Sequence, residues 1–265
     1  MAKHSKPEGR LASSLVWCIP LIPLALTIAI YWGDLQTPTF LWINRYTQIL
    51  PDVIWTWLTF LGNGWGMYAL CFPLLLLAPR LLSAGLIAAL LGGIVSQILK
   101  LWLALPRPAG VLAMEDFYRI GEPLLFKAMP SGHTITAFAV ISGIYFASTK
   151  DKRSSLWWLF ILAVFSGLSR NAIGAHWLTD VLAGSAIGLW AGMIGAWISE
   201  YIPDRQLAPN KIGPRILALG GVGAIYVLLT QTLDSDLNQS LQYACVALIA
   251  ITLAFFIKAQ TTKAI

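Results

Sequence analysis

Long, nearly uninterrupted apolar segments are the feature that most constrains the fold of this chain. Eight of them approach the roughly 20 residues that a helix needs to cross the hydrocarbon core of a membrane. They span residues 11–31, 56–78, 81–102, 133–149, 154–170, 177–199, 216–232 and 239–257. Only 11% of the 265 residues are charged, whereas soluble domains carry roughly a quarter. The sequence therefore predicts an all-α, polytopic membrane bundle and excludes a soluble globular protein.

The predicted spans divide the chain into a six-helix core and an extra C-terminal helix pair. The first six form a helical core over residues 1–202, which includes an outer loop at 103–130. A polar cytoplasmic connector is predicted at residues 203–214, followed by an extra pair of transmembrane helices at 215–265. The second span is the least regular, because the sequence Gly-Asn-Gly at 62–64 interrupts it.

The positions of Lys and Arg predict the orientation in the membrane. With a cytoplasmic N-terminus, twelve of the 18 basic residues fall on the inner side, namely Lys3, Lys6, Arg10, Arg80, Lys150, Lys152, Arg153, Arg205, Lys211, Arg215, Lys258 and Lys263. By the positive-inside rule, both termini are predicted to be cytoplasmic. The net charge of +6 then reflects topology, and no nucleic-acid partner is predicted, because the basic residues are scattered between apolar segments.

Two of the three histidines stand at the outer ends of predicted spans. His133 closes the sequence Pro-Ser-Gly-His at 130–133, where the free N–H groups at the start of a helix favour an anion. His176 precedes the sixth span, and Asp180 follows it by four residues, a spacing that places two side chains on one helix face. A carboxylate there holds one imidazole nitrogen protonated and leaves the other free as a nucleophile.

Further residues on the same membrane face complete a predicted phosphate site. They are Lys100, Arg107, Ser131, Gly132 and Arg170. Three cations, two imidazoles, a hydroxyl and backbone donors around one carboxylate suit a phosphoryl group. We predict that His176 attacks phosphorus, that Asp180 orients it, and that His133 protonates the leaving oxygen and then activates water. No metal or other cofactor is predicted, because the cations hold the phosphate oxygens.

Each residue also has a purely structural interpretation. A Lys at a helix end is commonly an interfacial anchor, Pro-Arg-Pro ordinarily stops a helix, and Pro-Ser-Gly commonly forms a turn and cap. Seven such residues at matching spacings on one face favour a catalytic site. Tryptophans near span ends are instead assigned to the aromatic belts at the membrane interfaces, namely Trp102, Trp157, Trp158 and Trp177.

The constellation resembles the signature of the type-2 phosphatidic acid phosphatase superfamily. Its three parts match in order: Lys100 with Arg107-Pro108, then Pro130-Ser131-Gly132-His133, then Ser169-Arg170 with His176 and Asp180. The resemblance implies the roles assigned above and a six-helix core over roughly 11–199. It also implies an integral membrane, metal-independent phosphatase for a lipid phosphate or diphosphate, such as undecaprenyl diphosphate, phosphatidylglycerophosphate, phosphatidic acid or lipid A phosphate.

Two other functions are compatible with the same residues. One is a phosphotransferase that passes the phosphoryl group from His176 to a lipid or sugar instead of water. The other is a phospholipid transporter in which the cations only bind. The expected partners are a lipid phosphate substrate and membrane lipids, and the sequence predicts no oligomeric state. The expected location is a bacterial-type inner membrane, with the site facing the periplasm or the exterior.

Overall fold

The computed structural model describes residues 14–261, and the regular secondary structure in that range is helical, as predicted. The earlier helices are α1 (Ser14–Cys18), α2 (Leu21–Trp32), α3 (Gln36–Thr47), α4 (Asp52–Phe60), α5 (Gly64–Cys71), α6 (Leu74–Leu77) and α7 (Pro79–Leu103). The later ones are α8 (Gly132–Ala147), α9 (Lys150–Leu156), α10 (Leu159–Ala172), α11 (Leu178–Glu200), α12 (Ile212–Thr230) and α13 (Gln239–Thr261). Short 3-10 helices form η1 (Pro108–Gly110), η2 (Asp204–Leu207) and η3 (Asp236–Asn238). The basic residues Lys3, Lys6, Arg10 and Lys263 and the start of the first predicted span lie outside the described residues.

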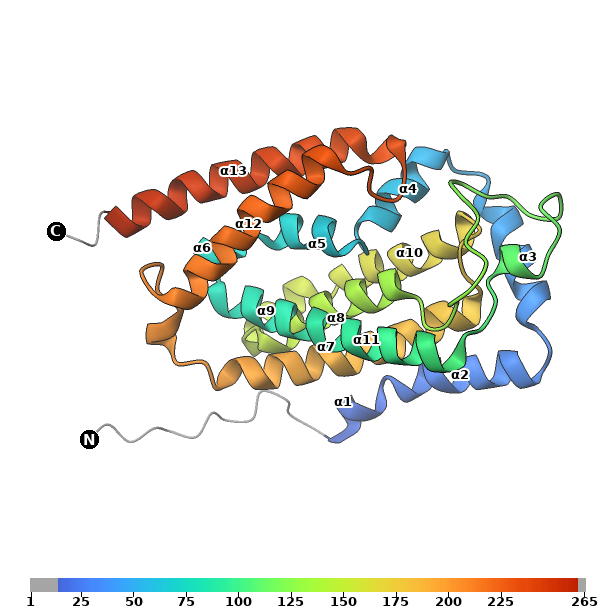
Figure 1. The fold of residues 1–265 in the computed structure, drawn as a ribbon. Helices are drawn as coiled ribbons and strands as arrows, with labels where there is room; N and C mark the ends of the chain where they lie inside the picture. Colours follow the sequence, from blue (N-terminus) through green and yellow to red (C-terminus); the bar gives the residue numbers. More distant parts are fainter. Residues whose placement is uncertain (1–13, 262–265) are drawn as a thin grey trace.

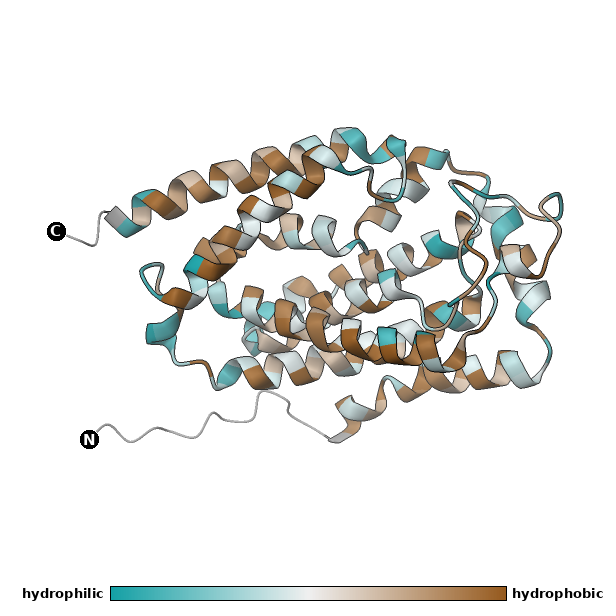
Figure 2. Cartoon of the chain, viewed as in Figure 1, coloured by the Kyte–Doolittle hydropathy of each residue, from teal (hydrophilic) through white to brown (hydrophobic). Residues whose placement is uncertain are grey.

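Five helical segments of the described chain are long and apolar enough to cross a membrane. They are Leu15–Trp32, Pro79–Gly110, Leu178–Glu200, Asp204–Thr230 and Asp236–Gln260. These segments coincide with the first, third, sixth, seventh and eighth predicted spans. The fourth and fifth predicted spans correspond to α8 and α10, which are apolar helices of 16 and 14 residues. Hydrophobic residues cover the helices, and polar residues gather mainly in the loops at the two ends of the bundle (Figure 2).

The second predicted span is not one helix, because α4, α5 and α6 divide it. The first break falls at the predicted Gly-Asn-Gly sequence, where the Asn63 side chain accepts hydrogen bonds from the backbone N–H groups of Trp65 and Gly66. Asn63 thereby caps α5. Two further helices were not predicted: α3, in the first outer connection, and α9, at the basic turn after the fourth span.

Helices α7, α8 and α11 pack together as the centre of the bundle (Figure 1). Small residues permit the close approach, as is common between membrane helices. A Cβ on Gly188 of α11 would overlap the Phe138 side chain of α8, and a Cβ on Gly192 would overlap Ser142. The two helices are therefore held backbone to backbone, and this fixes the relative positions of their N-terminal ends, where His133 and Asp180 lie.

The C-terminal helices α12 and α13 run side by side and pack against α5 (Figure 1). Their contact with the rest of the chain is a buried apolar cluster in which Phe72 and Leu75 meet Leu228, Ile249 and Phe256. The short η3 helix in the α12–α13 connection lies against α4. This packing brings the α12–α13 connection to the end of the bundle where α10 stops and α11 starts.

Candidate functional site

The eight predicted site residues all lie at one end of the bundle. They come from the last turn of α7 (Lys100), the loop after it (Arg107), the start of α8 (Ser131, Gly132, His133), the end of α10 (Arg170), and the α10–α11 turn with the first turn of α11 (His176, Asp180). Helices α7 and α10 end where α8 and α11 begin, so residues far apart in sequence meet there. Their catalytic and binding roles remain predictions.

His176 and Asp180 form a buried hydrogen-bonded pair. The distance from His176 Nδ1 to Asp180 Oδ2 is 3.1 Å, and each residue is 1% exposed. Asp180 Oδ2 also accepts a hydrogen bond of 2.9 Å from the backbone N–H of Trp177. The His176 backbone is fixed as well, because Asn171 Nδ2 donates to its carbonyl at 2.8 Å. With Nδ1 donating to the carboxylate, Nε2 is the nitrogen that carries the free lone pair.

The surroundings of His176 keep its imidazole neutral. Burial lowers the pKa of His176 well below its usual 6.5, and the positive charges of Arg107, Arg170 and Lys100 lower it further. Desolvation and like charges both disfavour the protonated form. A neutral imidazole with one nitrogen engaged is the form that can act as a nucleophile.

Arg170 is a buried cation that forms no ion pair in the described part of the chain, although the Asp234 carboxylate lies near enough to attract it. The residue is 5% exposed, its Nε has no hydrogen-bond partner, and none of the ion pairs among the described residues includes it. An unpaired buried charge is costly, so such a group is expected to bind an anion. Lys100 lies at the start of α8, since a Cβ on Gly132 would stand 3.4 Å from Lys100 Nζ.

Arg107 ties the outer loop to the α10–α11 turn. Its guanidinium donates to the carbonyls of Phe126 at 2.9 Å, Ala175 at 3.1 Å and Lys127 at 3.4 Å. These bonds occupy three of the five N–H donors of an arginine and leave two available for a ligand. Arg107 therefore holds the backbone next to His176, a contribution that the sequence did not predict.

Ser131 joins the starts of α8 and α11. Its backbone N–H donates to the Asp180 carbonyl at 3.0 Å. Its hydroxyl oxygen accepts a hydrogen bond of 2.9 Å from the Thr134 hydroxyl and a longer one from the Thr134 backbone, so it serves as the helix cap. The free N–H groups that follow Ser131 then point out of the start of α8, as an anion site requires.

Sequence reasoning did not place two polar residues at the site, namely Asp234, which contacts His133, and Asn63, which contacts Asp234. His133 Nε2 lies 2.8 Å from Asp234 Oδ1, and Asn63 Nδ2 donates to Asp234 Oδ2 at 2.9 Å. Asp234 belongs to the α12–α13 connection. The only signal in the sequence was the predicted placement of that connection on the outer face, which Asp234 shares with several other acids.

Trp177 corrects one prediction and shows how the outer loop is anchored. It is 2% exposed, packs edge-on against Phe40 of α3 and donates from Nε1 to the Pro106 carbonyl at 2.9 Å. It therefore belongs to the protein interior and not to an aromatic belt, because α3 covers it. Trp102 and Trp157 are 79% and 58% exposed, as the belt assignment requires.

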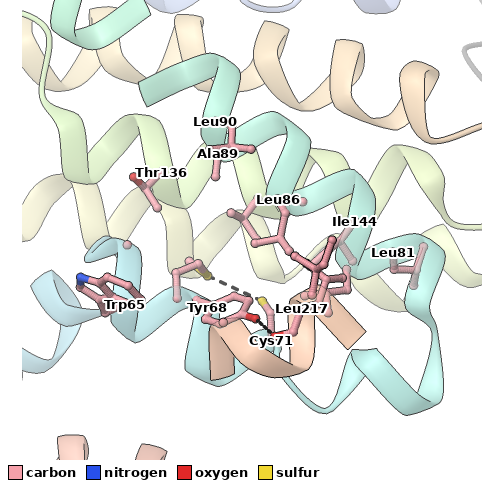
Figure 3. Close-up of a pocket in the computed structure, with 17 residues that line it drawn as sticks. Trp65, Tyr68, Cys71, Leu81, Leu86, Ala89, Leu90, Thr136, Ile144 and Leu217 are labelled. Carbon is pink, nitrogen blue, oxygen red and sulfur yellow. Dashed lines mark hydrogen bonds between the residues drawn. The ribbon is translucent and has the colours of Figure 1, made fainter. Parts of the chain in front are cut away.

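An apolar cavity of about 520 Å³ opens among α5, α7, α8 and α12 (Figure 3). Its lining includes Trp65, Tyr68, Leu86, Ala89, Thr136 and Leu217. The Tyr68 hydroxyl donates to the Leu217 carbonyl and so links α5 to α12 (Figure 3). Thr136 lies three residues after His133 on α8, so one end of the cavity is one helical turn from the polar site.

Comparisons with known proteins, by sequence and by structure, agree on one family. Residues 80–204 match the PAP2 superfamily. Among solved structures, LpxE of Aquifex aeolicus is 30% identical with a TM-score of 0.54, and the match covers 61% of this chain and 94% of that one. The transmembrane PAP2-type phosphatidylglycerolphosphate phosphatase of Bacillus subtilis has a similar fold, with 23% identity, a TM-score of 0.52, and 69% and 94% coverage.

Curated relatives align over parts of the chain. A lipid A 1-phosphatase of Porphyromonas gingivalis is 36% identical over 124 residues, which are 46% of this chain and 24% of that protein. The lipid A 1-diphosphate synthase of Escherichia coli is 26% identical over 185 residues, which are 62% of this chain and 75% of that protein. The chain thus spans about a quarter of the length of the Porphyromonas relative.

Proposed function

Because the chain belongs to the PAP2 superfamily, we propose that it is a membrane phosphatase that hydrolyses a lipid phosphate or diphosphate through a phosphohistidine. The reaction takes place at the outer end of the bundle, which faces the periplasm or exterior in the predicted topology. A lipid substrate enters from the surrounding membrane, and its phosphate reaches the cationic cluster.

The observation that carries this proposal is the unpaired Arg170 guanidinium beside the His176–Asp180 pair. A buried cation is stabilised by an anionic ligand, and the adjacent neutral imidazole is a nucleophile. A phosphoryl group suits both the cation and the imidazole. Its peripheral oxygens accept charge-assisted hydrogen bonds from the cation, and its phosphorus atom is the electrophile that the imidazole attacks. Lys100, the two remaining donors of Arg107 and the Gly132 N–H supply further contacts to those oxygens.

The chemical steps follow from the nitrogen atoms that are free. His176 Nε2 forms a bond to phosphorus as the bond from phosphorus to the leaving oxygen breaks, and the His133 imidazolium gives that oxygen its proton. Water then attacks the phosphohistidine, His133 takes a proton from the water, and the nitrogen–phosphorus bond breaks. Asp180 stabilises the positive charge that the His176 ring gains in the first step and loses when the nitrogen–phosphorus bond breaks.

The apolar cavity supports a lipid as the substrate. It extends from one turn below His133 along α7 and α8, and it is lined almost wholly by apolar side chains (Figure 3). An acyl or prenyl chain buried there places its phosphate at the polar end. The C-terminal helix α12 supplies part of the wall through Ile216, Leu217 and Gly220.

Phosphate release from a panel of lipid phosphates and diphosphates tests the proposal. We expect release by the wild type, none by His176→Ala, and full release by a His4→Ala control. An alkaline quench of the wild type during turnover is expected to trap phosphorus on His176. No release from any lipid tested would contradict a phosphatase and favour transport.

A phosphotransferase is the second candidate, favoured by the similarity to a lipid A 1-diphosphate synthase. A phosphotransferase shares with the phosphatase the formation of the phosphohistidine. It differs only in the molecule that accepts the phosphoryl group from His176. A phosphorylated lipid or sugar product formed in place of free phosphate would establish it. The same His176→Ala variant serves as the blank in that measurement.

A further inference from the structure

The connection between the C-terminal helices α12 and α13 brings the Asp234 carboxylate into contact with His133. Asp234 Oδ1 lies 2.8 Å from His133 Nε2, and the Asp234 side chain is 15% exposed. Its other oxygen accepts a hydrogen bond from Asn63, the residue that caps α5. Asp234 lies outside the region that matches the PAP2 superfamily, because that match ends at residue 204.

The segment that carries Asp234 is held by hydrogen bonds on both sides. Gln242 is 3% exposed, donates to the carbonyls of Leu228 and Gln231, and accepts from the N–H of Leu233. The fully buried Asn238 donates to the Leu233 carbonyl. The Trp57 indole donates to the Leu237 carbonyl and so ties the segment to α4.

The backbone at Asp234 is also unusual. Its φ is 63°, in the left-handed region that non-glycine residues seldom adopt. Such a conformation persists where surrounding contacts require it. The connection therefore presents the Asp234 carboxylate to His133 in one orientation.

The charges around His133 come from several elements. Burial is the largest effect that opposes a positive imidazole at His133; Arg170 of α10 and Lys100 of α7 also oppose it, and Asp234 favours it. Burial by itself would raise the pKa of Asp234, but His133, Arg170 and the Asn63 hydrogen bond lower it to about 2. Asp234 is therefore an anion throughout the pH range in which enzymes of this kind work.

We infer that Asp234 is a positioning residue for His133, and that the α12–α13 pair completes a second carboxylate–imidazole pair in the site. The inference rests on the proposed function. Asp180 orients the nucleophile His176, and Asp234 orients the proton donor His133, so each histidine has its own carboxylate.

This pairing assigns the two nitrogens of His133. In the imidazolium, Nε2–H donates to Asp234, and Nδ1–H is the proton given to the leaving oxygen. After transfer, His133 is neutral, Nε2 keeps its proton because the carboxylate holds it, and the Nδ1 lone pair takes a proton from water. The hydrogen bond thereby selects the tautomer that both steps need.

Kinetics with two leaving groups test the role of Asp234. We expect Asp234→Asn to lower kcat on an alkyl lipid phosphate about 10- to 100-fold, a common loss when an orienting hydrogen bond is removed. With p-nitrophenyl phosphate the loss should be much smaller, because that leaving group needs little protonation. Asp234→Glu is expected to restore part of the activity on the alkyl ester.

Asp236→Asn is the matched control. Asp236 lies two residues away at the start of η3, it is exposed, and among the described residues its side chain has no hydrogen-bond partner. This control removes the same charge from the same connection, so it should behave like the wild type. Equal losses on both substrates in Asp234→Asn would show a merely structural role. Higher activity in Asp234→Asn would show that the carboxylate blocks the site, and either result overturns the inference.

Nitrogen-15 NMR of the three histidines gives a readout that needs no lipid. We expect His133, assigned with a His133→Gln variant, to be protonated at Nε2 in the wild type and in Asp236→Asn, and to change tautomer or protonation state in Asp234→Asn. An unchanged His133 spectrum would overturn the inference even if the enzyme is a phosphatase. Conversely, a wild type that releases no phosphate would refute the proposed function, while the spectrum still tests the pair.

Discussion

Asp180 holds His176 through a hydrogen bond of 3.1 Å between Oδ2 and Nδ1, and both side chains are almost completely buried. The same carboxylate oxygen accepts the backbone N–H of Trp177 and so caps α11. One group thereby fixes the helix start and the orientation of the imidazole together. The orientation of His176, the proposed nucleophile, therefore depends on the folding of α11.

Replacing Asp180 by Asn tests this orientation. The amide keeps the size of the side chain but does not stabilise a positive imidazole, and it can turn its NH₂ toward Nδ1, which favours the wrong tautomer. We expect kcat to fall about 10²- to 10⁴-fold with little change in KM. Steady-state phosphate release measures both constants. An Asp116→Asn control in the exposed outer loop should leave them unchanged, and equal kcat values for all three proteins would contradict the role of Asp180.

Arg170→Gln tests whether the unpaired guanidinium is an anion-binding group. Orthovanadate inhibition should weaken about 10- to 100-fold, the effect of one or two hydrogen bonds to a charged partner. The unfolding temperature without ligand should not fall, because the wild type buries this cation with no ion pair and with no hydrogen bond at Nε. Arg119→Gln, in the outer loop, serves as the control for loss of charge. A destabilised Arg170→Gln protein with unchanged vanadate affinity would instead indicate a structural cation.

The pH dependence of kcat/KM tests the protonation state of His176. Its pKa in the free enzyme is lowered well below 6.5, chiefly by burial and then by Arg107, Arg170 and Lys100. The nucleophile is the neutral form, so activity is present above this lowered pKa and is lost as the pH falls through it. We expect the acidic limb of kcat/KM to lie below about pH 6. A half-maximal value at or above pH 6.5, measured with a slow substrate for which chemistry limits the rate, would be inconsistent with a neutral buried His176.

Filling the apolar cavity tests its role in holding the lipid chain. Ala89→Phe introduces a ring into the lining on α7. We expect KM for long-chain lipid phosphates to rise about 10-fold or more, because the chain loses buried apolar area, whereas p-nitrophenyl phosphate should be hydrolysed as by the wild type. Ile94→Phe, on the same helix at a position 59% exposed, is the control. An equal change in KM for long-chain lipid phosphates and for p-nitrophenyl phosphate would argue against a lipid chain in the cavity.

Several properties of this protein were readable from short stretches of sequence. The apolar segments predicted a helical membrane bundle because a backbone in lipid must form its hydrogen bonds within its own segment. The four-residue spacing of His176 and Asp180 places the two groups within reach through local geometry alone. The Gly-Asn-Gly sequence marked the break in the second span, although the division into α4, α5 and α6 was not predicted.

Other features depend on contacts between distant parts of the chain. Arg107 is tied to the Ala175 carbonyl, 68 residues away, and Asp234 meets His133 across 101 residues and Asn63 across 171. Trp177 is buried because α3, a helix without a strong apolar pattern, covers it.

Short stretches of sequence were enough to predict that the chain forms membrane-spanning helices and that three of its cations (Lys100, Arg107 and Arg170) and two of its histidines (His133 and His176) lie at the same end of them. Hydropathy and helix period are properties of single segments, so they can be recognised from the sequence without knowledge of the fold. The contact between the last two helices and the site became visible in the folded chain alone. That contact requires α12 and α13 to pack against α5. The packing brings Asp234 within hydrogen-bond distance of both Asn63 and His133. Packing between helices depends on the shapes of their surfaces, which hydropathy does not encode.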